Sequence, residues 1–132
     1  MDTRARIKVV VVDDSALVRG LLSEIINRQT DMTCVGAAAD PLQARELIRA
    51  VNPDVITLDV EMPRMDGFEF TRTIRRDARY AQIPIIMITS RTADKHRNHA
   101  LELGVNEYMG KPYQEDQLLA LIKRYTQETA LA

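Results

Sequence analysis

Disulfides, membrane-spanning runs and an excess of charge of one sign are all lacking in this sequence. The single cysteine, Cys34, has no second cysteine to pair with, which argues against a secreted, disulfide-stabilised scaffold. No apolar run approaches the length that crosses a bilayer, and the apolar stretch after MDTRARIK is too short for a secretory signal. We therefore expect a cytoplasmic protein with no membrane partner.

The positive and negative charges of the sequence nearly cancel. Eighteen Lys and Arg residues stand against 19 Asp and Glu residues, which gives a formal net charge of −1. Proteins whose main partner is nucleic acid need a basic surplus or patch, so we expect no nucleic-acid partner. A chain of 132 residues that is 45% hydrophobic and 28% charged has an ordinary soluble composition and is most simply one domain, residues 1–132.

Short β-branched runs alternate along the chain with segments of helical spacing. The strand-like runs are 7–12, 33–37, 54–58, 84–88 and 106–109. Between them, apolar residues recur at intervals typical of a helix with one buried face. The predicted faces are Leu17, Val18, Leu21, Leu22, Ile25 and Ile26; Leu42, Leu47, Ile48 and Val51; Phe68, Phe70 and Ile74; Ala100, Leu101 and Leu103; and Leu118, Leu119, Ile122 and Tyr125. Five strand–helix pairs predict an α/β fold, a (βα)5 parallel sheet covered by helices on both faces.

Residues that start and stop helices agree with this alternation. Ser15 and Asp40 stand where helix N-caps are expected, and Pro41 suits a first helical position. Asn52, which precedes a proline, and Gly104 predict the ends of the second and fourth helices.

Polar residues follow the apolar runs at the point where each predicted strand ends. They are Asp13 and Asp14 after the first run, Asp59 after the third, Thr89 after the fourth and Lys111 after the fifth. In a parallel sheet these positions meet at one edge, where α/β proteins bind ligands. Carboxylates crowded together repel, and Mg²⁺ would reconcile them while keeping places for water and phosphate oxygens. A metal, a hydroxyl and a lysine around a reactive carboxylate predict a site for transient phosphoryl transfer.

These motifs resemble those of the receiver domains of bacterial two-component response regulators, the CheY-like family. The matching motifs are Asp13-Asp14, Asp59 in LDVEMPRMDG, Thr89 in PIIMITS, and Lys111-Pro112. The resemblance covers residues 7–125 and implies the doubly wound flavodoxin/CheY-like fold with strand order 2-1-3-4-5. To about residue 70 the sequence is similar to receivers of chemotaxis methylesterases (CheB). From about residue 84 it is more similar to receivers of CheA-type hybrid kinases.

The resemblance also implies a role for each site residue. Asp59 would accept a phosphoryl group from a histidine kinase or phosphotransfer domain. Mg²⁺ would be bound by Asp14, by Asp59 and by the backbone carbonyl of Glu61, with Asp13 acting through a water molecule. Gly67 would close the loop that follows Asp59.

The resemblance also implies which residues respond when Asp59 is phosphorylated. Lys111 would pair with one phosphoryl oxygen, and Thr89 would hydrogen-bond another. Tyr108 falls where the family carries its switch aromatic, and we expect it to fill from outside the space that Thr89 vacates. The downstream protein would bind the face made by the fourth helix, the fifth strand and the fifth helix, and we expect the pathway to be chemosensory.

Two charges are predicted to tune the lifetime of the phosphorylated state. Glu61 lies two residues after Asp59, and Arg91 lies two residues after Thr89. If they bridge across the site, or if Arg91 contacts the phosphoryl group, they would hinder the hydrolytic water. The alternative is that both charges are solvated and contribute less than about 1 kcal/mol as a pair.

Other functions fit the sequence less well. Haloacid-dehalogenase-type phosphatases also use an Asp nucleophile with later Thr and Lys, but they carry a second Asp where this sequence has Glu61, and they lack the early Asp pair. A bare interaction module would not need the full acceptor set. His96 and His99 share a helix face and could bind a metal, but without an evident third ligand we expect solvated side chains. We therefore expect a receiver rather than an enzyme; the alternatives are a receiver taken from a larger hybrid kinase or methylesterase, or a phosphate sink.

Overall fold

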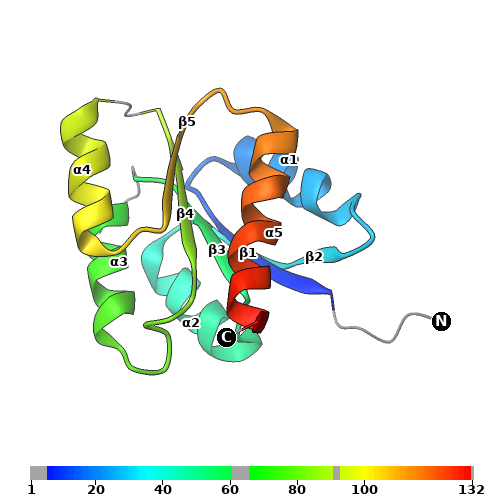
Figure 1. Ribbon diagram of the computed structural model, residues 1–132, viewed down its shortest axis with the longest axis horizontal. Helices are drawn as coiled ribbons and strands as arrows, with labels where there is room; N and C mark the ends of the chain where they lie inside the picture. The colour runs from blue at the N-terminus through cyan, green and yellow to red at the C-terminus, as the bar shows by residue number, and fades with distance from the viewer. Residues whose placement is uncertain (1–5, 61–65, 91–92, 132) are drawn as a thin grey trace.

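The computed structural model describes residues 6–60, 66–90 and 93–131, with side chains to residue 126. Strand and helix alternate five times along the chain (Figure 1). The elements are β1 (Ile7–Val12), α1 (Ala16–Asn27), β2 (Met32–Ala38), α2 (Pro41–Val51), β3 (Val55–Leu58), α3 (Gly67–Arg76), β4 (Ile85–Thr89), α4 (Asp94–Leu103), β5 (Glu107–Gly110) and α5 (Glu115–Leu131). Across these described ranges, we find no helix both long and apolar enough to cross a membrane.

The five strands form one parallel sheet in the order β2-β1-β3-β4-β5. This confirms the predicted fold class and the strand order that the resemblance implies. β1 begins and ends where the sequence predicts, and the other strands differ from their predicted bounds by one residue at either end. The valines of β1 are at most 1% exposed because helices cover both faces of a central parallel strand.

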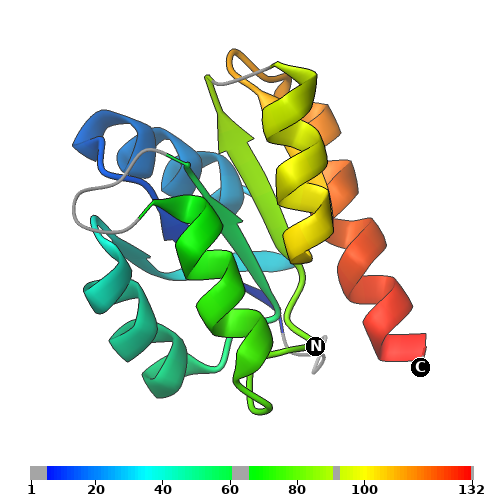
Figure 2. The same cartoon turned by 90° about the vertical axis from the view of Figure 1, so that its left-hand side faces the viewer.

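Each face of the sheet has its own hydrophobic core (Figures 1 and 2). On one face, α1 and α5 pack Leu22, Ile26, Leu118 and Ile122 against the strands. On the other face, α2, α3 and α4 contribute residues such as Ile48, Phe70 and Ala100. Successive strand residues point to opposite faces, so β1 sends Val9 and Val11 to one core and Val10 and Val12 to the other.

The predicted helix ends are confirmed by their capping geometry. Ser15 Oγ accepts a hydrogen bond from the Val18 N–H at 3.2 Å, and Asp40 Oδ1 accepts one from the Gln43 N–H at 2.9 Å. α2 ends at Asn52 with a left-handed φ of 47°, and α4 ends at Gly104 with a φ of 108°.

The predicted apolar faces are wider than the faces that the helices bury. Leu17 is 72% exposed, Leu21 49%, Leu42 59% and Leu101 42%, although each was expected on a buried stripe. A helix lying on a sheet buries only the residues that point at the strands, and those on its flanks need a neighbour to cover them. Cys34 is partly buried, with Sγ 3.4 Å from both Ser23 Oγ and the Gly36 carbonyl oxygen.

Candidate phosphoryl-transfer site

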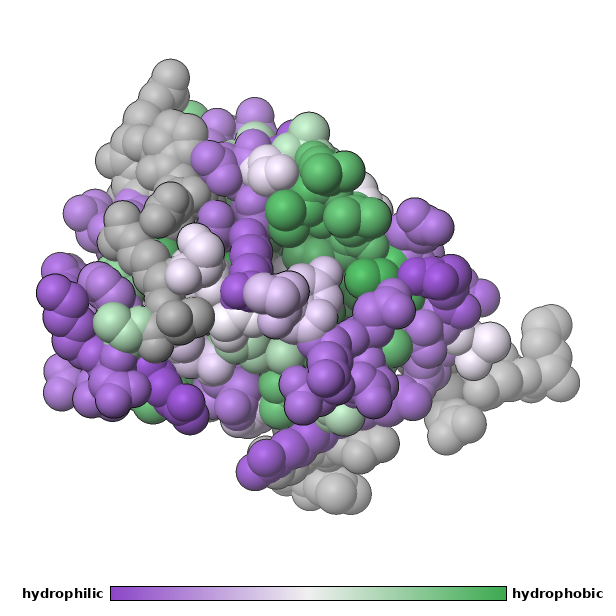
Figure 3. Space-filling view, turned by 90° about the horizontal axis from the view of Figure 1, so that it is seen from above, coloured by the Kyte–Doolittle hydropathy of each residue, from purple (hydrophilic) through white to green (hydrophobic). Residues whose placement is uncertain are grey.

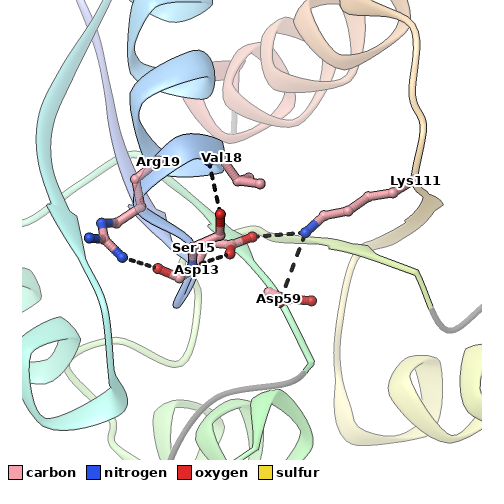
Figure 4. A network of polar contacts seen from close by, with 6 residues as sticks. All are labelled: Asp13, Ser15, Val18, Arg19, Asp59 and Lys111. Atoms are coloured by element: carbon pink, nitrogen blue, oxygen red, sulfur yellow. Dashed lines mark hydrogen bonds and ion pairs between the residues drawn. The ribbon is translucent and has the colours of Figure 1, made fainter.

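The carboxyl ends of four strands bring the predicted site residues to one edge of the sheet. Asp13 directly follows β1, Asp59 directly follows β3, Thr89 ends β4 and Lys111 directly follows β5. One carboxylate oxygen from each of Asp13, Asp14 and Asp59 lies within 4.8 Å of the others. Lys111 Nζ reaches into the same cluster (Figure 4). The structure therefore brings these residues together as the sequence predicts.

Asp13 is 2% exposed, and each of its polar groups has a partner. Its N–H donates to the Ala38 carbonyl at 3.1 Å, and its own carbonyl accepts from Arg19 Nη1 at 2.8 Å. Oδ1 accepts from the Ser15 N–H at 2.9 Å, and Oδ2 accepts from Lys111 Nζ at 3.0 Å (Figure 4). A buried carboxylate needs such partners, and these four contacts fix both the position of Asp13 and the direction of its oxygens.

Asp59 and Asp14 are held less tightly than Asp13. Asp59 is 7% exposed, its N–H donates to the Val12 carbonyl at 3.0 Å, and its Oδ2 lies 3.9 Å from Lys111 Nζ. Asp14 is exposed. Lys111 Nζ is thus closer to Asp13 than to Asp59.

The charge and the donor atoms of the cluster suit a hard divalent cation. Among the described residues, the three carboxylates of this cluster outnumber the one ammonium group that contacts them. Carboxylate oxygens are the ligands that Mg²⁺ prefers, and one or two of them commonly suffice. Among the described residues, these three aspartates are also the one group of His, Cys, Asp or Glu side chains placed to share an ion.

Gly67 allows α3 to begin directly against the backbone of Asp59. Its N–H donates to the Val60 carbonyl at 2.7 Å. A Cβ at this position would lie 2.5 Å from the Asp59 carbonyl oxygen and 2.9 Å from Val60 Cα, both too close for a side chain. Asp66, which sequence reasoning missed, caps α3 by accepting from the Glu69 N–H at 2.9 Å; an Asp three residues before a Glu is the signal that could have found it.

Thr89 and Tyr108 lie on neighbouring strands behind the acidic cluster. Thr89 is fully buried, and its carbonyl accepts from the Lys111 N–H at 2.9 Å. Tyr108 pairs in register with Met87 and is 8% exposed, within the core of the α2–α3–α4 face. Tyr108 also lines a groove with residues of α4 and α5, and its role in switching stays a prediction.

Tyr113 is a neighbour of the site that sequence reasoning missed. Partial burial, together with the negative charges of Glu115 and Asp13, raises the pKa of its phenol above the ordinary value. The phenol therefore stays neutral beside the acidic cluster. Its place directly after Lys111-Pro112 is the sequence signal that could have drawn attention to it.

Two further expectations have different outcomes. Glu61 and Arg91 lie outside the described residues, so the carbonyl ligand and the lifetime-tuning pair stay predictions. His99 is exposed, as expected, and His96 is partly buried. Their ring centroids lie 6.4 Å from Phe68 of α3 in a stacked geometry for His96 and 4.8 Å edge-on for His99. They form part of the packing between α4 and α3.

Comparison with known proteins identifies the family of this fold and site. Residues 9–123 match the model of the response regulator receiver domain, and the chain belongs to this family. A protein-glutamate methylesterase/protein-glutamine glutaminase 1 from Albidiferax ferrireducens is 56% identical over 109 residues, covering 81% of this chain and 28% of the relative. The response regulator domain of Thermotoga maritima CheB has a TM-score of 0.83 at 35% identity, covering 94% of this chain and 98% of that domain.

The comparisons confirm the resemblance predicted from the sequence. The receiver domain of a signal transduction histidine kinase from Syntrophus aciditrophicus has a TM-score of 0.82 at 25% identity, covering 92% of this chain and 90% of that one. The chain spans less than a third of the Albidiferax methylesterase, and the match of 109 residues lies in the receiver. The catalytic part of that methylesterase has no counterpart in this chain. Receiver domains act in two-component signalling, where they interact with histidine kinases and effector domains.

Proposed function

We propose that the protein is a phosphorylation-controlled binding module in which Asp59 is the phosphoacceptor. The observation that carries this proposal is the single edge where the Asp59 carboxylate lies beside two further aspartates and 3.9 Å from Lys111 Nζ. A carboxylate oxygen of Asp59 would attack the phosphorus of a phosphohistidine, so that an O–P bond forms as the N–P bond breaks. The released imidazole then takes up a proton from solvent.

The neighbours of Asp59 have distinct parts in this reaction. Bound by Asp13, Asp14 and Asp59, Mg²⁺ would supply positive charge opposite the transferring phosphoryl oxygens. Lys111 would turn from Asp13 toward the new acyl phosphate, because the phosphoryl group carries more negative charge than a carboxylate. Thr89 would donate its hydroxyl to a second phosphoryl oxygen. Attack by water on phosphorus then returns Asp59 and inorganic phosphate, so the chemistry is confined to the protein's own carboxylate.

Labelling with acetyl phosphate tests the acceptor directly. We expect one alkali-labile phosphate per chain when Mg²⁺ is present, and none after chelation or in Asp59→Asn. Asp54→Asn is the matched control, because Asp54 precedes the same strand at its opposite end and accepts from the Lys8 N–H at 2.8 Å. Labelling that persists in Asp59→Asn would contradict the proposal.

The surface of α1 beside the site suits a helical phosphodonor. Leu17 and Leu21 of α1 are 72% and 49% exposed, and a Cβ added at Gly20 would meet no atom within 4 Å. Figure 3 shows the molecule of Figure 1 from above, and on this face a patch of apolar residues lies among hydrophilic ones. Leu17 and Leu21 lie in the first two turns of α1, directly after the acidic pair, and would offer a docking surface for the kinase or phosphotransfer domain.

Substitution of one leucine separates donor docking from chemistry. We expect Leu17→Ser to slow transfer from a phosphorylated histidine-phosphotransfer domain about fivefold, equivalent to about 1 kcal/mol of apolar contact. Labelling by acetyl phosphate, which needs no docking, should be unchanged. Leu101→Ser on α4, a leucine 42% exposed, is the control. Equal transfer rates in wild type, Leu17→Ser and Leu101→Ser would contradict the assignment of α1 as the docking surface.

We further propose that the output surface is the face of α4, β5 and α5. A groove of about 660 Å³ runs along it, lined by residues that include Tyr108, Tyr113, Gln117 and Leu121. Tyr108 joins this groove to the strand beside Thr89, so a movement of Thr89 toward phosphate would alter the groove's floor. Beryllofluoride, a mimic of the phosphoryl group, should therefore shift NMR signals of residues 94–110; shifts that spare them would count against this surface.

A chemosensory role, alone or within a longer methylesterase or kinase, accords with the relatives.

A further inference from the structure

Arg19 of α1 contacts the turn that carries the acidic pair at two points. Its backbone N–H donates to the Ser15 carbonyl at 2.9 Å, which is the first hydrogen bond of α1. Its guanidinium Nη1 donates to the Asp13 carbonyl at 2.8 Å (Figure 4). Arg19 therefore binds both residues that flank Asp14, namely Asp13 and Ser15.

The Asp13 carbonyl needs this donor because it lies beyond the hydrogen-bond ladder of the sheet. The last carbonyl of β1, on Val12, accepts from the Asp59 N–H at 3.0 Å, and the Asp13 N–H still pairs with β2 through Ala38. The Asp13 carbonyl accepts instead from the α1 side chain. Asp13 is 2% exposed, and a buried carbonyl left without a donor destabilises the folded state.

The position of Asp14 depends on these two contacts of Arg19 more than the positions of Asp13 and Ser15 do. Asp13 has its own contacts to Ser15 and Lys111. In the described parts of the chain, by contrast, the exposed Asp14 side chain makes no hydrogen bond or ion pair. Its direction is therefore set by the backbone of the turn, and two of that turn's carbonyls are bound by Arg19.

We propose that Arg19 is a positioning residue that fixes the turn Asp13–Ser15 and thereby aims the Asp14 carboxylate at a divalent cation. This rests on the proposed function, since that function places Mg²⁺ at the three aspartates. The charge of Arg19 alone would have the opposite effect, because a nearby cation repels another cation. The sign of the change in Mg²⁺ affinity thus separates positioning from simple electrostatics.

Mg²⁺ titration of Arg19→Gln, followed by amide NMR shifts, measures that sign. We expect Arg19→Gln to bind Mg²⁺ about tenfold more weakly, at the low end of the effect seen for residues that orient metal ligands. Arg19→Lys keeps the charge and one donor but not the planar fork, so we expect an intermediate affinity. Arg28→Gln, at the other end of α1, removes the same charge from an exposed pair with Glu115 and should bind at least as tightly as wild type.

A second readout needs no metal. In EDTA, amide hydrogen exchange at Ser15 should be faster in Arg19→Gln than in wild type, because the turn that holds the Ser15 N–H against Asp13 is looser. Affinity for Mg²⁺ at or above the wild-type value in both Arg19 variants, or unchanged exchange at Ser15, would overturn the positioning role while leaving the proposed function intact. Failure of wild type itself to bind Mg²⁺ would overturn both.

Discussion

Thr57 lies within β3, and in the described part of the chain its hydroxyl has no hydrogen-bond partner. The residue is 1% exposed, and within the described chain its Oγ1 is a buried oxygen without a hydrogen bond. It shares its face of the strand with Val55 and Asp59, toward α1 and α5. A buried unsatisfied hydroxyl destabilises the folded state, and valine has nearly the same shape.

Thr57→Val should therefore raise the free energy of unfolding by about 1 kcal/mol, equivalent to a rise of about 4 °C in melting temperature. Thr71→Val is the matched control: Thr71 is also fully buried, but its hydroxyl donates to the Gly67 carbonyl at 2.8 Å, so the same change should destabilise. Thermal melts followed by circular dichroism measure both. A drop in stability for Thr57→Val would show that the hydroxyl has a partner in solution.

At the scale of elements, the start of α3 packs directly against the backbone of Asp59, at the end of β3. A methyl group on Gly67 would lie 2.5 Å from the Asp59 carbonyl oxygen, so helix and strand would have to separate. At the far end of α3, Arg75 donates to the carbonyls of Gly104, Ala81 and Ile83 and to Asn106 Oδ1, which also accepts from the Ile85 N–H. α3 is thus held at both ends and has little freedom to yield.

Gly67→Ala should lower the free energy of unfolding by about 2 kcal/mol and slow labelling of Asp59 by acetyl phosphate. Gly20→Ala is the opposite case, because no atom within 4 Å would meet the new methyl group in the interior of α1. There the lower flexibility of the unfolded chain should stabilise the protein by about 0.5–1 kcal/mol. Urea unfolding of the two variants tests both signs, and a neutral Gly67→Ala would mean that the helix start shifts freely.

For the whole molecule, the acidic edge links stability to the metal. Three carboxylates within 4.8 Å of one another cost the folded state free energy that Mg²⁺ should offset. At ten times its dissociation constant the ion should stabilise the fold by about 1.4 kcal/mol. Asp14→Ala should abolish this increment and raise the stability measured in EDTA, whereas Asp54→Asn should keep the full response. An equal rise in melting temperature in wild type and Asp14→Ala would contradict the assignment.

Sequence reasoning predicted the features that depend on local spacing. The valine run of β1, the caps at Ser15 and Asp40, and the meeting of Asp13 with Asp59 all follow from strand and helix periodicity. It did not predict features decided by which elements lie side by side. The exposure of Leu17 depends on what covers the flank of α1.

Side-chain contacts across the fold escaped prediction for the same reason. The contact of His99 with Phe68 depends on α4 lying against α3, and the burial of Tyr108 depends on the core that β5 shares with that helix pair. The bond from Arg19 to the Asp13 carbonyl requires a side chain to reach back to its own turn. No periodicity in the sequence encodes these contacts.

The contact between Lys111 and Asp13 joins residues 98 positions apart, which directly follow β5 and β1, the last and the first strand along the chain. During synthesis, the ribosome releases Asp13, Asp14 and Asp59 well before it releases Lys111. A nascent chain therefore exposes the carboxylates without their ammonium partner, and contacts of such separation form late in folding. The assembled site thus exists only in a chain that has been translated through β5 and has closed its sheet, and a shorter nascent chain holds its three carboxylates without the Lys111 contact.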